Sequence, residues 1–215
     1  MLKETIEGYR LFTNEEKRVE IYVSADSPTD PSSVHSKTPL SALNLNWREK
    51  ELPERERTKH VHRLHPYLGK FIPQLVEIFL RKYFQPGQTV FDPFSGSGTT
   101  LVQANELGIH SVGCDISGFN VMLARAKTKR YSMDTVRREI SDILDRVGSI
   151  VVKKSAQLEL HFVAPVLFDE ADTHSKYLKT WFAPQALLEL LTFRNLIPEY
   201  DDQDILNVVL SRAAR

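Results

Sequence analysis

A glycine-rich turn at residues 92–100 constrains the fold of this chain more than any other stretch. The apolar residues before it predict a short buried strand that ends at Asp92. Gly96 and Gly98 follow, and a threonine pair then opens a segment with helical periodicity. Glycines let the backbone approach a ligand closely, and the free N–H groups of a first helical turn face that ligand. The stretch therefore predicts a ligand-binding turn between a strand and a helix.

The residues around Gly98 separate the ligand classes that use such a turn. A phosphate-binding P-loop needs a lysine before its Ser or Thr, but here Thr99 follows Gly98 directly. The dinucleotide-binding fingerprint needs a third glycine at the position that Leu101 occupies. Another enzyme that binds nucleotide phosphates with this turn, and a purely structural turn, remain as alternatives.

The string Asp-Pro-Phe-x-Gly-x-Gly-Thr-Thr resembles the S-adenosylmethionine loop of amino-group DNA methyltransferases, which methylate N4 of cytosine or N6 of adenine. Upstream, the string His-Pro-Tyr-x-Gly-Lys-Phe resembles the segment that precedes this loop in the family and flanks the methionine end of the cofactor. Taken alone, that segment also fits a Pro-Gly turn before a helix. The resemblance implies that S-adenosylmethionine is bound by His65, Tyr67, Lys70, Asp92, Phe94, Ser95, Gly96, Ser97, Gly98, Thr99 and Thr100.

A second predicted strand, residues 109–115, ends at Asp115, which lies 23 positions beyond Asp92 (115 − 92). In this architecture an acid about 20 residues on from the glycine turn bonds the ribose hydroxyls. We expect Asp115 to do so and the next residue, Ile116, to pack against the adenine ring. Capping of a helix is the alternative role for Asp115. The neighbouring Cys114 is expected to be a small buried apolar residue.

The resemblance implies an α/β fold, the doubly wound parallel sheet of a Rossmann-like methyltransferase. We expect an N-terminal arm and linker at 1–45, a methyltransferase core at 46–148, and a mainly helical insertion or start of a target-recognition region at 149–215. Amphipathic patterns predict helices over about 71–83, 101–107, 119–131 and from 134 onward, and Gly108 fits a helix C-cap. Weaker patterns suggest strands at 19–23 and 158–163, a helix opening at 180–184 and a last helix from about 201.

Composition limits the other functions. Lys and Arg number 28 and so do Asp and Glu, so any DNA-binding surface must be local. The single cysteine excludes an internal disulfide and a cysteine-based zinc site. His60, His62 and His65 are badly spaced for one metal, and we expect no metal.

The basic residues 57–70 and 125–130 suit DNA phosphates, a helix C-terminus or a solvated face. No signal peptide or membrane span is visible, so we expect a cytoplasmic protein.

The catalytic tetrapeptide of the family, (Asp/Asn/Ser)-Pro-Pro-(Tyr/Phe/Trp), does not occur here, because the chain contains no Pro-Pro. In the family its polar residues hold the target amine and its aromatic ring stacks on a flipped-out base. We therefore predict no catalytic residue in these 215 residues. In the resembled sheet the strand at 89–92 is central, so its second side would be left open. Both observations predict an incomplete enzyme, completed by a second polypeptide or truncated.

The sequence thus predicts the S-adenosylmethionine-binding part of a DNA methyltransferase that acts on double-stranded DNA. Cytosine N4 is favoured over adenine N6 because this variant of the loop and of the upstream segment is more similar to that subgroup. A non-catalytic remnant or regulatory module, with the loop kept as a structural turn, is the alternative from a different functional class.

Overall fold

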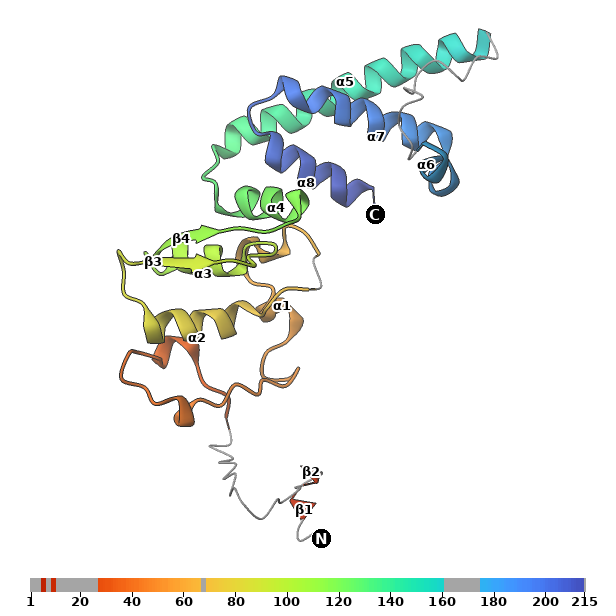
Figure 1. Ribbon diagram of the computed structural model, residues 1–215. Helices are drawn as coiled ribbons and strands as arrows, with labels where there is room; N and C mark the ends of the chain where they lie inside the picture. The colour runs from red at the N-terminus through yellow and green to blue at the C-terminus, as the bar shows by residue number, and fades with distance from the viewer. Residues whose placement is uncertain (1–4, 7–8, 11–26, 67–68, 161–174, 215) are drawn as a thin grey trace.

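The structure is a computed structural model that describes residues 5–6, 9–10, 27–66, 69–160 and 175–214 (Figure 1). An α/β part comes first in the chain and a bundle of helices follows it. The helices and strands are β1 (Thr5–Ile6), β2 (Tyr9–Arg10), η1 (Pro31–Ser33), η2 (Leu40–Ala42), α1 (Glu54–Arg57), η3 (His60–Arg63), α2 (Pro73–Tyr83), β3 (Thr89–Asp92), α3 (Thr99–Glu106), β4 (His110–Gly113), α4 (Gly118–Thr128), α5 (Met133–Leu160), α6 (Ser175–Trp181), α7 (Pro184–Leu196), η4 (Ile197–Glu199) and α8 (Gln203–Ala213).

Two parallel strands, β3 and β4, form the sheet that carries the glycine turn. Thr89 pairs with His110 and Asp92 pairs with Gly113, so the carboxyl ends of both strands meet at one edge of the sheet. Helix α3 connects the two strands in a β–α–β unit. With the helical segment that follows, this confirms the predicted Rossmann-like α/β class with a helical C-terminal part. In the described residues the sheet contains these two strands alone.

Helices α2, α3 and α4 form one layer on the sheet, with α3 packed between the other two. Apolar side chains from four elements build the core beneath this layer: Leu80 of α2, Val90 of β3, Ala104 of α3, and Ile109 just before β4. Helix α3 ends as its sequence predicts, because Gly108 takes a left-handed conformation (φ 68°) and Ile109 N–H donates to the Ala104 carbonyl at 2.9 Å.

The opposite face of the sheet is exposed. Side chains alternate between the two faces of a strand, so Phe91 points away from the face that buries Val90. Phe91 lies beside Val112 in the register, and the two side chains are 61% and 54% exposed. Neither the free side of β3 nor this face is covered by another described element. We call Phe91 and Val112 the open apolar face.

The helical part has a core of its own. Helix α5 packs along α7, and α8 closes the bundle (Figure 1). The buried side chains of this core are Ile143, Val147, Val151, Leu188, Phe193, Leu196, Ile197 and Leu206. Helix α8 also packs against α4 through Val208, which is buried with Leu123 and Ala126. The last helix therefore joins the helical part to the α/β part.

The end of α8 holds the segment that precedes α2. Arg212 Nη1 donates to the backbone carbonyls of Arg63 and Leu64 at 3.2 and 3.1 Å. Ser211 Oγ lies 3.1 Å from His65 Nε2. Residues 63–65 are consequently fixed by a helix about 150 positions later in the chain.

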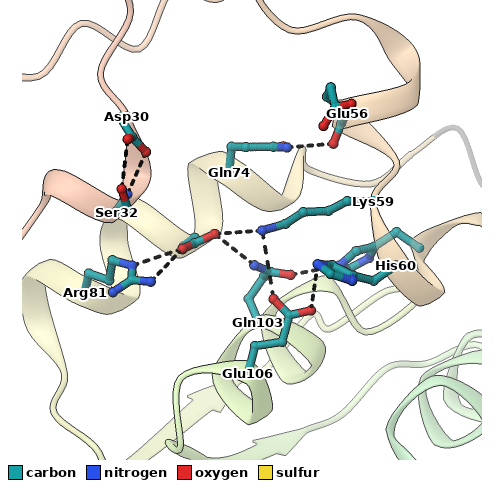
Figure 2. Close-up of polar contacts among 11 residues, drawn as sticks. Asp30, Ser32, Glu56, Lys59, His60, Gln74, Arg81, Gln103 and Glu106 are labelled. Atoms are coloured by element: carbon teal, nitrogen blue, oxygen red, sulfur yellow. Dashed lines mark hydrogen bonds and ion pairs between the residues drawn. The ribbon is translucent and has the colours of Figure 1, made fainter.

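A buried polar network lies between η3, α2 and α3 (Figure 2). The Glu77 carboxylate accepts from Lys59 Nζ at 2.9 Å, from Arg81 at 2.9 Å and from Gln103 Nε2 at 3.4 Å. Gln103 Oε1 in turn accepts from the Nε2–H of His62 at 3.0 Å, and His62 is fully buried. Burial alone raises the pKa of the Glu77 carboxyl, but the bonds from Lys59 and Arg81 outweigh it and lower that pKa.

Several local expectations were wrong. Residues 158–160 are the last residues of α5 and are not a strand. Helix α7 begins at Pro184, because a proline suits the first helical turn, whereas the expected opening at Thr180 and Trp181 belongs to α6. Phe71 precedes α2 and is exposed. Residues 19–23 and 161–163 lie outside the described residues. Gly148, the expected domain boundary, lies within α5, and the domain division stays a prediction.

Candidate functional site

The glycine turn joins the carboxyl end of β3 to the first turn of α3. Asp92 Oδ1 accepts from Phe94 N–H at 3.0 Å, and Gly98 N–H donates to the Ser95 carbonyl at 2.8 Å. Gly96 and Gly98 have φ of 50° and 83°, in the left-handed region. The first amide groups of a helix have no acceptor within the helix. The turn therefore directs the amides that begin α3 toward the edge where both strands end.

Gly98 is confined by helix α4. A Cβ atom at Gly98 would lie 2.9 Å from the Ala124 Cβ and 3.0 Å from its Cα, which is closer than such atoms approach one another. Thr99 and Ser97, on either side, are buried as well. The turn is thus packed on its inner side and leaves its outer side for a ligand.

Asp115 links this turn to the next helix. Its Oδ2 accepts from Gly96 N–H at 2.9 Å, and its Oδ1 accepts from Ser117 N–H at 2.8 Å and from Asn120 Nδ2 at 3.0 Å. The bond from Ser117, then those from Asn120 and Gly96, hold the pKa of the Asp115 carboxyl below its usual range. A carboxylate has about four acceptor sites, so one is left for a further donor. The N-cap of α4 is Ser117, so Asp115 does not cap that helix, and its ribose role stays a prediction.

The upstream segment lies against the first turn of α4. The His65 ring meets the Phe119 ring edge-on, with centroids 5.3 Å apart, and Phe119 follows closely on Ile116. Lys70 Nζ donates to the His62 carbonyl at 2.7 Å. The structure thus places His65 beside the start of the helix that follows Asp115. Tyr67 lies outside the described residues.

Two apolar side chains stand out from the two loops. Phe94, in the glycine turn, is 87% exposed, and Ile116, after Asp115, is fully exposed. Because each stands on one of the two predicted cofactor loops, apolar surface there suits a flat, partly apolar ligand.

The expectation that Cys114 is buried is wrong, because it is exposed. Cys114 directly follows β4, at the open edge where both strands end, and no described helix covers it there. Its Sγ donates to the Pro93 carbonyl at 3.4 Å, and its own carbonyl accepts from Ser95 N–H at 3.0 Å. Its side chain and its backbone thus both contact the turn.

The charged clusters noted in the sequence are held apart. His60 lies 3.6 Å from Glu106, whereas His62 and His65 contact Gln103 and Ser211. In the described part of the chain no three His, Cys, Asp or Glu side chains gather as a metal site requires.

The basic run at the end of α4 is engaged within the protein. Arg125 pairs with Asp204 of α8 at 3.1 Å, and Lys129 pairs with Asp202 at 2.5 Å. These contacts favour the structural interpretation of the run over DNA phosphates.

Sequence reasoning missed two residues of the site, Asn120 and Lys127. Asn120 contacts Asp115, and the Nζ of Lys127 donates to the Ser97 carbonyl at 2.8 Å. The helical spacing after Asp115 was a usable signal for Asn120. A lysine within a basic run gives no sign that it is buried.

Comparison with known proteins identifies the family of this chain. A family model described as DNA methylase, covering N6 and N4 methyltransferases, matches residues 7–125. The match covers more than half of the chain, so this chain belongs to the DNA amino-methyltransferase family. No solved structure shows a significant match to it.

Three curated relatives are Type II methyltransferases. M.MjaII of Methanocaldococcus jannaschii is 54% identical over 95 residues, which is 44% of this chain and 18% of that protein. M.MvaI of Kocuria varians is 28% identical over 165 residues, 75% of this chain and 33% of that protein. M.BsoBI of Geobacillus stearothermophilus is 28% identical over 107 residues, 48% and 21% of the two chains. The chain matches a third or less of the length of each relative. No helix in the described residues is long and apolar enough to cross a membrane.

Proposed function

We propose that this chain is the S-adenosylmethionine-binding part of a site-specific DNA methyltransferase. The observation that carries the proposal is the bond from Gly96 N–H to the Asp115 carboxylate at 2.9 Å. It joins the two predicted cofactor-binding loops at one edge of the sheet, where ligands bind in open α/β folds. The family, and the Type II methyltransferases among its relatives, support this assignment.

Each loop has a part in the proposed site. The glycine turn and the first amides of α3 face the methionine part, with Asp92 and the His65–Lys70 segment beside it. Asp115 accepts from a ribose hydroxyl at its remaining acceptor site. Phe94 and Ile116 supply apolar surface for the adenine ring. When bound, the cofactor supplies an electrophilic methyl group on a sulfonium sulfur.

The proposed target is an exocyclic amine of double-stranded DNA, with cytosine N4 favoured over adenine N6. The similarity of the loop and upstream segment to the cytosine subgroup supports this choice. A base is reached by flipping it out of the duplex, and the reaction then depends mostly on the positions of the amine and the methyl group. Since the target is DNA, we expect the protein to act in the cytoplasm.

We propose further that the catalytic strand lies outside these 215 residues, either on a second polypeptide or on a further segment of the same protein. No Pro-Pro occurs in these 215 residues, so the chain lacks the family's catalytic tetrapeptide. The open apolar face and the free side of β3 support the proposal, because a central strand of this fold is normally paired on both sides and covered on both faces. We expect the isolated chain to bind cofactor but to transfer no methyl group.

Titration calorimetry with S-adenosylmethionine tests the cofactor part. The folded wild-type chain should bind, and Asp115→Ala should weaken binding strongly. Asp134→Ala is a matched control, because that carboxylate is exposed at the start of α5, away from the loops. A folded wild-type chain that does not bind would instead favour the non-catalytic module. Methyl transfer to DNA by the isolated chain would refute the need for a second polypeptide.

A further inference from the structure

Helix α4 carries a buried cation directly behind the glycine turn. Lys127 is 5% exposed, and its Nζ donates to the Ser97 carbonyl at 2.8 Å. Burial lowers the pKa of Lys127 to about 8, and the nearby charge of Lys70 adds to this effect. Among the described residues Lys127 forms no ion pair. A buried ammonium without a carboxylate partner costs folding free energy, and one hydrogen bond to a backbone carbonyl offsets only part of that cost. Stability alone is therefore a weak reason for a lysine at this position.

The same face of α4 contacts the turn one residue further on. Ala124 lies three positions before Lys127 and therefore on the same side of the helix. Its backbone and methyl group are the atoms that a side chain at Gly98 would strike. Ser97 itself is 1% exposed. Helix α4 thus contacts two adjacent residues of the turn. Lys127 makes a polar contact with Ser97, and Ala124 makes an apolar contact with Gly98.

The turn needs such a hold. Two of its residues are glycines in left-handed conformations, and glycine has the largest freedom of any residue to leave them. The Asp115 carboxylate fixes the Gly96 amide from one side. From the other side, Lys127 donates to the Ser97 carbonyl.

We propose that Lys127 is a positioning residue for the cofactor: through the Ser97 carbonyl it keeps the glycine turn in the shape that binds the ligand. The proposal rests on the proposed function of the turn as the S-adenosylmethionine loop. Lys127 touches the turn from behind and is not itself a ligand-binding residue. Its loss should loosen the turn while the sheet and the helical part keep their stability.

The test compares Lys127→Met, which keeps the length of the buried stem, with Lys129→Met at the C-cap of the same helix. Lys129 pairs with Asp202 and touches no residue of the turn. Amide hydrogen exchange of residues 95–99 should be about tenfold faster in Lys127→Met, as for loss of one charged hydrogen bond. S-adenosylmethionine affinity should fall about tenfold as well. Lys127→Arg should restore much of both, and Lys129→Met should change neither.

Unchanged exchange of the turn in Lys127→Met would overturn the proposal, whether or not the wild-type chain binds cofactor. A general rise in exchange that includes α7 would also overturn it, since it would reveal a merely structural role. Should the Met variant not fold, Lys127→Gln, whose side chain is too short to reach the carbonyl, gives the same comparison. Wild-type protein that fails to bind cofactor would refute the proposed function alone.

Discussion

Two separate constraints disfavour any side chain at Gly98. Its φ of 83° is unfavourable for any residue with a Cβ, and the Cβ would lie 3.0 Å or less from Ala124. Gly98→Ala should therefore cost about 1–3 kcal/mol of unfolding free energy and weaken binding of S-adenosylmethionine. Urea unfolding and calorimetry measure the two effects. Gly118→Ala is the control, because that glycine has open space around it. Equal effects of both substitutions would contradict the prediction.

His62 makes the stability of the protein depend on pH. Burial, partly offset by the bond to Gln103, lowers the pKa of His62 to about 4, while an unfolded histidine has a pKa near 6.5. As the pH falls from about 6.5 to 4, the unfolded chain takes up a proton that the folded chain refuses. The free energy of unfolding should therefore fall by about 3 kcal/mol over this window.

His62→Gln removes that titration and keeps a hydrogen-bonding side chain at the position. Urea unfolding at several pH values between 7 and 4 should give a flatter dependence for the variant than for the wild type. His35→Gln, at an exposed histidine, should keep the wild-type slope. If His62→Gln also keeps that slope, the assignment of the pH effect to His62 is wrong.

At the scale of residues, the sequence predicted the positions of the glycine turn and of the two acids better than their environment, and their role in binding a cofactor stays a prediction. Asp92, Gly98 and Asp115 were placed correctly at one sheet edge, because a strand–glycine–helix pattern fixes backbone geometry locally. The burial of Lys127 and the exposure of Cys114 depend on which helix covers which edge. That information is tertiary and is not encoded in the spacing of either residue.

Among the elements, helix α8 holds the two parts of the molecule together. Leu206 is fully buried in the helical core with Ile143 and Leu188. Leu206→Ala should cost about 2–5 kcal/mol of unfolding free energy, since the deletion leaves a cavity that helices close only partly. Leu144→Ala, at an exposed leucine of α5, should cost less than about 0.5 kcal/mol. Thermal or urea unfolding checks the pair, and similar losses would show that the core is misassigned.

Helices whose first or last residues carry a recognisable sequence signal were predictable, and those without such a signal were not. Gly108 marks the end of α3, and it caps that helix as expected. Residues 158–160 alternate apolar and charged side chains, which suits a strand as well as the last turn of a long helix. Residues 158–160 are helical because they continue α5, which begins at Met133. A short stretch of sequence does not reveal that continuation. Pro184 was a usable signal for the start of α7.

For the whole molecule, the open apolar face predicts self-association. Phe91 and Val112 expose apolar surface next to an unpaired side of β3, the arrangement that favours edge-to-edge contacts. The isolated chain should sediment faster as its concentration rises, and Phe91→Lys should suppress this change. Tyr83→Lys removes an exposed aromatic ring of α2 instead and should leave sedimentation as in the wild type. Concentration-independent sedimentation of the wild-type chain would contradict the prediction.

The contact between α8 and residues 63–65 also sets an order of events during synthesis. Ser211 follows His65 by 146 positions, so at about 5–20 residues per second it is made about 7 to 30 s later. The β3–α3–β4 unit contains only short-range connections and has time to form in that interval. Residues 63–65 therefore reach this anchorage only after α8 has left the ribosome. The glycine turn relies on contacts with Asp115 and α4, so it can take its shape before the segment upstream of α2 is fixed.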